Sequence, residues 1–250
     1  MPSWLHACLW ALACSSALVL GALVGQRAPL SPRAIAAIMA FGSGVLVSAL
    51  SFDLLDKAFR DGGIIPCVGG SFLGAAIFTL AAFFLNRRGA RHRKRSRGQP
   101  GEAETAGSGL AIAAGAFLDG IPESLVIGIG SLRGERIDFA LLGAFFLSNF
   151  PEGLSSAAGM KRAGRSARYI FIVWGFIALA SGAAAAIGNL VFAGAAAATL
   201  AFINSFAAGA ILAMLADTMI PEAFEEVHDF TGLITACGFL TAFALSRLTG

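Results

Sequence analysis

Two short segments of the chain each place a proline and a carboxylate in the middle of a long apolar run. They are residues 117–124 (FLDGIPES) and 146–153 (FLSNFPEG), which match at four positions with a constant offset of 29 residues. A carboxylate at membrane depth is costly and is treated as a functional site by default. A proline within a helix leaves a backbone carbonyl unpaired one turn earlier, here that of Leu118 or Leu147. The two segments therefore predict a cation site built from carboxylates and free carbonyls.

The spacing of the polar residues places them on shared helix faces. Asp119 lies four residues before Glu123, and Ser148 lies four residues before Glu152, and residues at this spacing share one face of a helix. Asn149 lies on a neighbouring face. If the two helices pack together, these side chains converge on one site whose ligands are all oxygens, which suits harder cations such as Mn, Mg or Ca. Three carboxylates repel one another when no cation is bound, so cation entry is expected to release a proton. The alternative is that they serve only as hydrogen-bonded contacts between helices.

The composition indicates a polytopic membrane protein. The chain is 57% hydrophobic and 13% charged, which is too apolar for a soluble globule of this length. We expect an all-α fold with about eight transmembrane helices in one domain over residues 1–250. The apolar windows are 4–25, 34–56, 64–86, 108–130, 138–160, 169–191, 197–221 and 230–248. The 31 glycines permit close helix packing within the lipid bilayer and a homodimer.

Basic residues predict the orientation. Seven of them lie between residues 87 and 97, and placing this loop in the cytoplasm puts thirteen Lys and Arg inside and five outside. The positive-inside rule then favours both termini outside. Residues 87–107 are expected to form a disordered cytoplasmic loop, which acidic lipid headgroups would attract. Nucleic-acid binding is not expected of a loop so short and so close to the membrane.

A second internal similarity suggests an inverted repeat. Residues 41–46 (FGSGVL) resemble residues 206–211 (FAAGAI), and the same offset of 165 aligns Ala58-Phe59 with Ala223-Phe224. In the predicted topology these two helices run in opposite directions. The pattern predicts that helices one to three repeat as helices six to eight around helices four and five, as in many secondary transporters. Chance similarity between two helices rich in Gly and Ala is the alternative.

Acidic residues flank the candidate site on both sides. Asp53 and Asp56 lie toward the predicted outer end of the second helix, and Asp217 and Glu222 toward the inner end of the seventh. Because carboxylates concentrate cations, these residues are candidates for the entrance and exit of a cation pathway. The other acidic residues near the second group are equally consistent with an ordinary solvent-exposed loop: Glu225, Glu226 and Asp229.

These motifs resemble the ZIP family of divalent metal transporters, which has eight membrane helices, external termini and a variable cytoplasmic loop after the third helix. In that family the fourth and fifth helices carry tandem metal-binding motifs, whose places Pro122-Glu123 and Pro151-Glu152-Gly153 fill here. Residues 41–46 and 206–222 resemble its second and seventh helices. The resemblance implies a transporter of the plasma or inner membrane that moves Zn, Mn, Fe or a similar cation into the cytoplasm. The metal would be a substrate rather than a cofactor, and its path would pass between helices four and five by an elevator-like movement.

The chain departs from the family pattern at several positions. Asp119 and Ser148 stand where the family usually has His or Gln one turn before each motif glutamate. Leu179-Ala180 occupies the place of a usual Glu-Pro pair in the sixth helix, and the basic loop holds only His92. We therefore expect a single oxygen-rich metal position, and the identity of the metal stays open.

Other readings of the sequence remain. The missing carboxylate in the sixth helix is consistent with a non-transporting relative that binds metal or acts as a scaffold. An intramembrane hydrolase would need Ser43 or Ser108 as nucleophile and His228 as base. The sequence lacks the GxxxxGK[ST] loop of ATP-driven proteins, and no enzymatic activity is expected.

Overall fold

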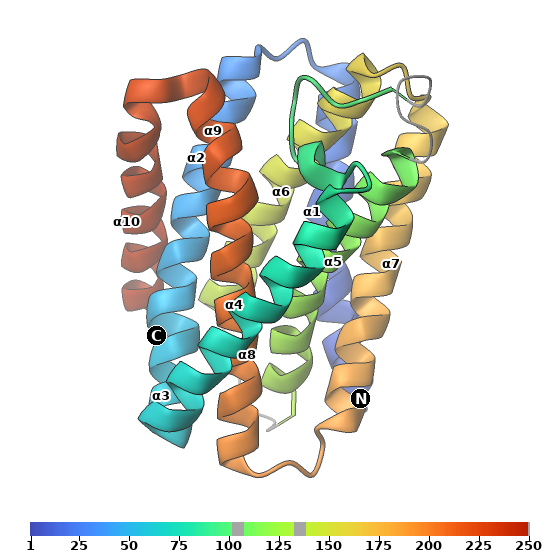
Figure 1. The fold of residues 1–250 in the computed structure, drawn as a ribbon. Coiled ribbons are helices and arrows are strands. Elements are labelled where there is room, and N and C mark those ends of the chain that lie inside the picture. The colour runs from blue at the N-terminus through green and yellow to red at the C-terminus, as the bar shows by residue number, and fades with distance from the viewer. Residues whose placement is uncertain (102–107, 133–138, 250) are drawn as a thin grey trace.

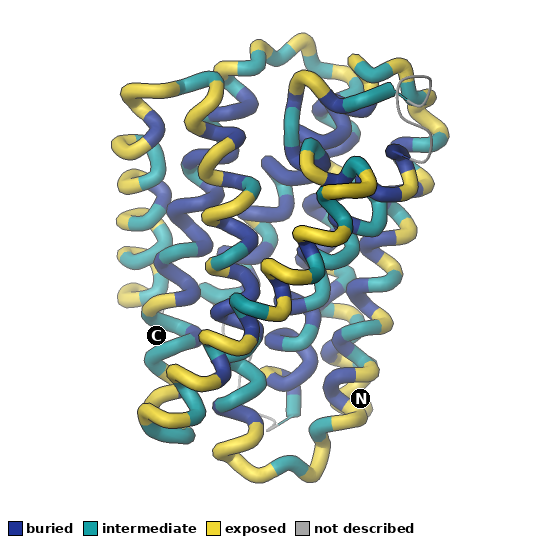
Figure 2. Tube along the Cα trace, viewed as in Figure 1, coloured by how far each residue is buried: buried dark blue, intermediate teal, exposed yellow. Residues whose placement is uncertain are grey.

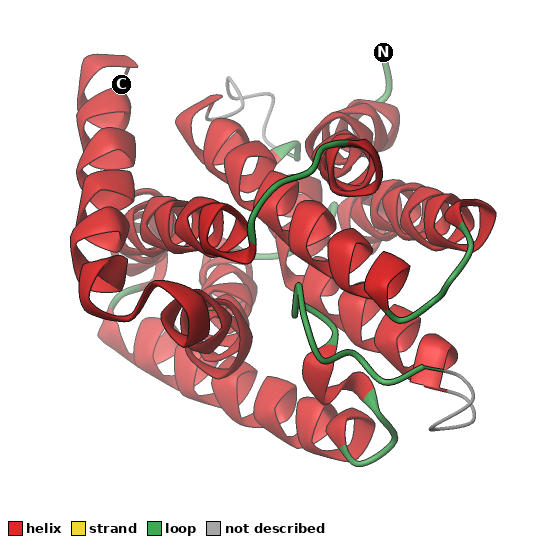
Figure 3. Cartoon of the chain, turned by 90° about the horizontal axis from the view of Figure 1, so that it is seen from above, coloured by secondary structure: helices red, strands yellow, loops and turns green. Residues whose placement is uncertain are grey.

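The computed structural model describes residues 1–101, 108–132 and 139–249, and its regular structure in these ranges is helical, with no strand (Figures 1 and 3). Two π-helical segments, Leu50–Leu55 and Leu215–Met219, and two 3-10 turns, Ala90–His92 and His228–Phe230, interrupt the α-helices. The α-helices are α1 (Ser3–Arg27), α2 (Pro32–Ala49), α3 (Asp56–Gly62), α4 (Ile64–Asn86), α5 (Ser108–Gly130), α6 (Phe139–Arg162), α7 (Ala167–Val191), α8 (Ala197–Met214), α9 (Ile220–Val227) and α10 (Thr231–Thr249).

The described helices coincide with the predicted apolar windows to within a few residues at their ends. Six segments are long and apolar enough to cross a membrane: Ser3–Arg27, Pro32–Gly62, Ile64–Asn86, Ser108–Gly130, Ala167–Val191 and Ala197–Leu248. The last has 52 residues, which would measure about 78 Å as one straight helix. It turns at His228, where φ is 50°, and α10 runs back beside α2 (Figure 1). The chain is therefore a membrane-embedded helical bundle, whereas eight crossings stay a prediction.

The two π-helical segments lie at matching positions in the chain. Leu50 and Leu215, which begin them, are separated by the offset of 165 that relates residues 41–46 to 206–211. Gly44 on α2 packs against the backbone of α10, and Gly209 on α8, at the same offset, packs against the backbone of α4. α2 and α8 run in opposite directions (Figure 1). The sequence similarity is thus accompanied by equivalent helix breaks and equivalent close helix contacts.

These close contacts predict a cost for any side chain at Gly44. A Cβ there would overlap the carbonyl oxygen of Thr235 and lie 2.8 Å from the backbone nitrogen of Phe239. Gly44→Ala is therefore expected to destabilise the bundle by about 1–3 kcal/mol, as overpacking does. The control is Gly175→Ala on α7, because nothing lies within 4 Å of a Cβ there. Thermal unfolding of the two variants in detergent measures the difference, and equal melting temperatures would contradict the α2–α10 contact.

Residues 87–101, here called the basic segment, fold against the bundle. The sequence predicted a disordered loop over residues 87–107, of which 102–107 lie outside the described residues. In the described part, Ala90, Arg93 and Lys94 are buried, and Figure 2 shows how burial varies along the chain. The physical reason for this difference is that carboxylates of α5, α6 and α9 supply partners for the charges of the segment. The basic segment lies in the upper part of Figure 1, while the chain begins at the lower end.

Candidate functional site

The two Pro-Glu segments lie on separate helices that other elements hold apart. Asp119 on α5 and Glu152 on α6 are both buried, and Pro122 and Pro151 lie within these helices. In the described ranges, α5 packs mainly against α7 and α8, and α6 against α1 and α2, with little direct contact between α5 and α6. The expected direct packing of these two helices is therefore not what brings the carboxylates together. The basic segment reaches into the space between them.

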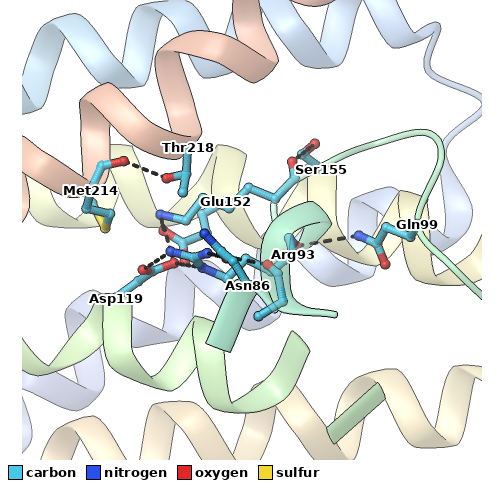
Figure 4. A network of polar contacts seen from close by, with 10 residues as sticks. Asn86, Arg93, Gln99, Asp119, Glu152, Ser155, Met214 and Thr218 are labelled. Atoms are coloured by element: carbon cyan, nitrogen blue, oxygen red, sulfur yellow. Dashed lines mark hydrogen bonds and ion pairs between the residues drawn. The ribbon is translucent and has the colours of Figure 1, made fainter. Parts of the chain in front are cut away.

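Arg93 of the basic segment binds Asp119 through two parallel contacts (Figure 4). Its Nε donates to Asp119 Oδ2 at 2.8 Å and its Nη2 donates to Oδ1 at 2.9 Å. The same guanidinium donates through Nη1 to Asn86 Oδ1 at 3.2 Å. Both partners of the ion pair are only 1% exposed. A planar guanidinium matches a carboxylate in this two-point geometry, which makes such pairs the stronger ones. Both carboxylate oxygens of Asp119 are therefore engaged.

Lys94 joins the two Pro-Glu helices. Its Nζ lies 2.8 Å from Glu152 Oε2 and 3.3 Å from Asp119 Oδ2, and its side chain is 2% exposed. The backbone carbonyl of Lys94 accepts a hydrogen bond of 2.7 Å from Ser155 Oγ, which fixes the segment against α6. A single positively charged atom thus lies between one carboxylate of α5 and one of α6.

The other predicted site residues have separate partners. The carboxyl group of Glu123 interacts with the side chain of Asn149, whose Nδ2 also donates to the Cys14 carbonyl of α1 at 3.4 Å. Ser148 Oγ donates to the Phe145 carbonyl within its own helix at 3.0 Å. Within the described ranges, no three His, Cys, Asp or Glu side chains converge closely enough to hold a metal ion. The side chains of Arg93 and Lys94 take up the space in which Asp119 and Glu152 would have to meet a metal.

The predicted pathway residues fall in different places. Asp53 and Asp56 line a cavity of about 480 Å³ at the α3 end of the bundle, together with Lys57, Arg60, Asp61, Phe52, Ser246 and Arg247. Asp53 accepts a hydrogen bond from Ser246, and Asp56 pairs with Arg60. Glu222 is buried and accepts a 2.8 Å hydrogen bond from the backbone nitrogen of Ser96 in the basic segment. Asp217 is exposed in its π-helical segment.

From the sequence, the basic residues were expected to orient the chain and to attract acidic lipid headgroups, and Arg93 and Lys94 were not expected in the site. Glu225 and Glu226 were candidates for an ordinary polar loop. In the structure Arg95 Nη2 lies 2.5 Å from Glu225 Oε1, and Arg97 lies 3.7 Å from Glu226. The opposite charges of the seven basic residues and of the acidic residues of α9 indicated that the two could pack together. They did not indicate which two basic side chains would be buried.

The electrostatics of the basic segment give a prediction for His92. Burial and the positive charges of Arg95 and Arg91 lower the pKa of the His92 imidazole below its ordinary value of 6.5. Protonation is therefore disfavoured in the folded state, and this group makes stability fall as pH drops below 6.5 toward the folded pKa. Arg95→Gln removes one repulsion and is expected to raise the His92 pKa. Titration by NMR of ¹³C-labelled histidine, with His6 and His228 replaced by Asn, measures it; an ordinary pKa in the parent chain would contradict the packing of the segment.

No protein-family model matches the chain, and no curated protein matches it. The function is therefore inferred from the residues and the geometry of the site.

Proposed function

We propose that the chain is a divalent metal cation transporter that moves Zn, Mn, Fe(II) or a similar ion toward the cytoplasm through a site between α5 and α6. One observation carries the proposal. Buried carboxylates from two successive Pro-Glu helices face a single cationic atom, Lys94 Nζ, at 2.8 Å from Glu152 and 3.3 Å from Asp119. A position that holds an ammonium group between two carboxylates has the charge and the oxygen ligands that a hard divalent cation requires.

The number of carboxylates supports a role beyond helix association. Ionisable groups within membrane helices are rare and mark ion pathways. One ion pair is enough to join two helices, yet three buried carboxylates, Asp119, Glu123 and Glu152, lie on α5 and α6. Glu123 lies one turn along the same helix from Asp119, so a cation leaving the Asp119–Glu152 position has a third carboxylate within reach.

The proposal includes an inverted repeat within eight membrane crossings, in the plasma or inner membrane with both termini outside. The matched π-helical segments Leu50–Leu55 and Leu215–Met219 and the opposite directions of α2 and α8 (Figure 1) support it. The basic segment lies away from the end where the chain begins, which is consistent with a cytoplasmic position under the positive-inside rule.

A second candidate is a non-transporting membrane protein that binds metal or acts as a scaffold. The observation in its favour is that Arg93 and Lys94 already neutralise Asp119 and Glu152. An intramembrane hydrolase has less support, because Ser43 Oγ donates to the Met39 carbonyl of its own helix and His228 packs on Phe224.

Uptake into proteoliposomes separates the two candidates. The purified chain is reconstituted into vesicles loaded with a metal-sensitive dye, and Zn, Mn, Fe(II), Cd, Co and Mg are presented in turn. The proposal expects influx of at least one ion above that of protein-free vesicles. Folded protein that moves none of these ions at several pH values would favour the non-transporting candidate.

A further inference from the structure

We infer that Arg93 and Lys94 are built-in competitors of the transported cation, so that these two residues set the affinity of the site and its preference for divalent ions. The inference rests on the proposed function and deepens it. The basic segment would then be more than a cytoplasmic linker: it would hold the site closed with its own charges until a metal ion replaces them.

Arg93 and Lys94 contact the same carboxylate oxygens that a bound metal ion would require. Arg93 uses both carboxylate oxygens of Asp119, and Lys94 contacts Oδ2 of Asp119 and Oε2 of Glu152. A hard divalent cation bridging these carboxylates would need some of the same oxygens at about 2.0–2.6 Å. It would also lie within a few ångströms of two buried positive charges. Metal binding to both carboxylates and the present position of the segment therefore exclude each other.

The exchange of Arg93 and Lys94 for one divalent cation leaves the charge of the site unchanged. When Arg93 and Lys94 leave the site, two positive charges depart, and one divalent cation restores both. The buried carboxylates are then never left without a compensating charge, which is the costly state for buried ion pairs. A monovalent ion would restore only half of that charge. Replacing Arg93 and Lys94 by a metal ion therefore favours a divalent over a monovalent cation, although both would use the same carboxylate oxygens.

The basic segment is attached to the bundle by polar contacts that water can replace. Its regular structure is a single 3-10 turn, Ala90–His92, and its buried part is mainly polar. It is held through the Ser155–Lys94 and Ser96–Glu222 hydrogen bonds and a 3.2 Å bond from Gln99 to the Ser156 carbonyl. Gly89 and Gly98 flank its inserted part with positive φ values of 108° and 68°, a backbone region open to glycine. The segment can therefore withdraw without unfolding a helix.

The test is equilibrium binding of Mn²⁺ to the full chain in detergent, followed by EPR of the free ion. The variant Arg93→Gln/Lys94→Gln is compared with Arg91→Gln/Arg97→Gln, which removes the same charge from exposed positions of the same segment. If Arg93 and Lys94 occupy the site for 90–99% of the time, their removal lowers the apparent Kd for Mn²⁺ by about ten- to a hundredfold. The control pair is expected to stay within about twofold, since exposed charges act through screened potentials.

A second variant keeps the test decisive if the double variant does not fold. Lys94→Gln retains the Arg93–Asp119 pair and is expected to bind Mn²⁺ more tightly than the parent chain. Binding in the variants but not in the parent chain also supports the inference. Mn²⁺ binding that depends on Glu152 but is equally tight in the parent chain, Lys94→Gln and the double variant would overturn the inference and leave the proposed function standing. No binding of Mn²⁺, Zn²⁺ or Cd²⁺ to any folded variant would overturn both.

Discussion

Glu152→Gln is expected to lower divalent cation uptake by about ten- to a hundredfold. The substitution preserves the shape of the side chain but removes the charge that faces Lys94 Nζ at 2.8 Å. Interactions with a charged group contribute about 1.5–3 kcal/mol, and each 1.4 kcal/mol changes an equilibrium constant about tenfold. Dye-loaded proteoliposomes with matched amounts of folded protein measure the change.

The matched control for Glu152→Gln is Asp229→Asn, which makes the same change from carboxylate to amide at an exposed position beyond α9. Its uptake is expected to equal that of the parent chain. Lys94 keeps its contact with Asp119 at 3.3 Å in Glu152→Gln, so the variant should remain folded, which a melting curve checks. Undiminished uptake by folded Glu152→Gln would place the cation path elsewhere.

Asp119→Asn is expected to lower the stability of the folded chain by about 1.5–3 kcal/mol, because it removes the charged partner of Arg93. Arg93 is 1% exposed and donates two hydrogen bonds to this carboxylate. Melting of the full chain in detergent, without added metal, is the measurement. Asp56→Asn is the control, since it breaks the exposed pair with Arg60, and exposed pairs contribute at most about 1 kcal/mol.

A variant that replaces both partners of the ion pair shows whether this loss of stability comes from the pair itself. Replacing both partners with apolar residues, as in Arg93→Met/Asp119→Leu, should be less destabilising than Asp119→Asn alone, because no uncompensated charge stays buried. Equal losses of stability in Asp119→Asn and Asp56→Asn would contradict the buried Arg93–Asp119 pair.

The helices and the candidate carboxylates were predictable from the sequence. Long apolar windows determine where helices form in a membrane, and Pro122-Glu123 and Pro151-Glu152 stand out because prolines and carboxylates are unusual there. The matched π-helical segments were not predictable from hydropathy, although the internal similarity around Gly44 and Gly209 indicated that the two regions correspond.

The partners of the carboxylates were not predictable. Seven basic residues lie within eleven positions of the basic segment, and nothing local distinguishes Arg93 and Lys94 from Arg91 or Arg97. Which of them turn inward depends on the backbone path from α4 to α5 and on the groups that α5, α6 and α9 present. These are long-range contacts, as the Lys94–Glu152 and Ser96–Glu222 pairs illustrate. Asp217 is exposed, and its place in a cation pathway stays a prediction.

Anomalous diffraction from crystals of the full chain grown with Mn²⁺ would locate a cation bound between α5 and α6. We expect an anomalous peak between α5 and α6, within about 2.6 Å of carboxylate oxygens of Glu152 and of at least one of Asp119 and Glu123, with Lys94 Nζ withdrawn from Glu152. Peaks confined to other places, such as the cavity lined by Asp53 and Asp56, with the Lys94–Glu152 pair intact, would contradict this expectation.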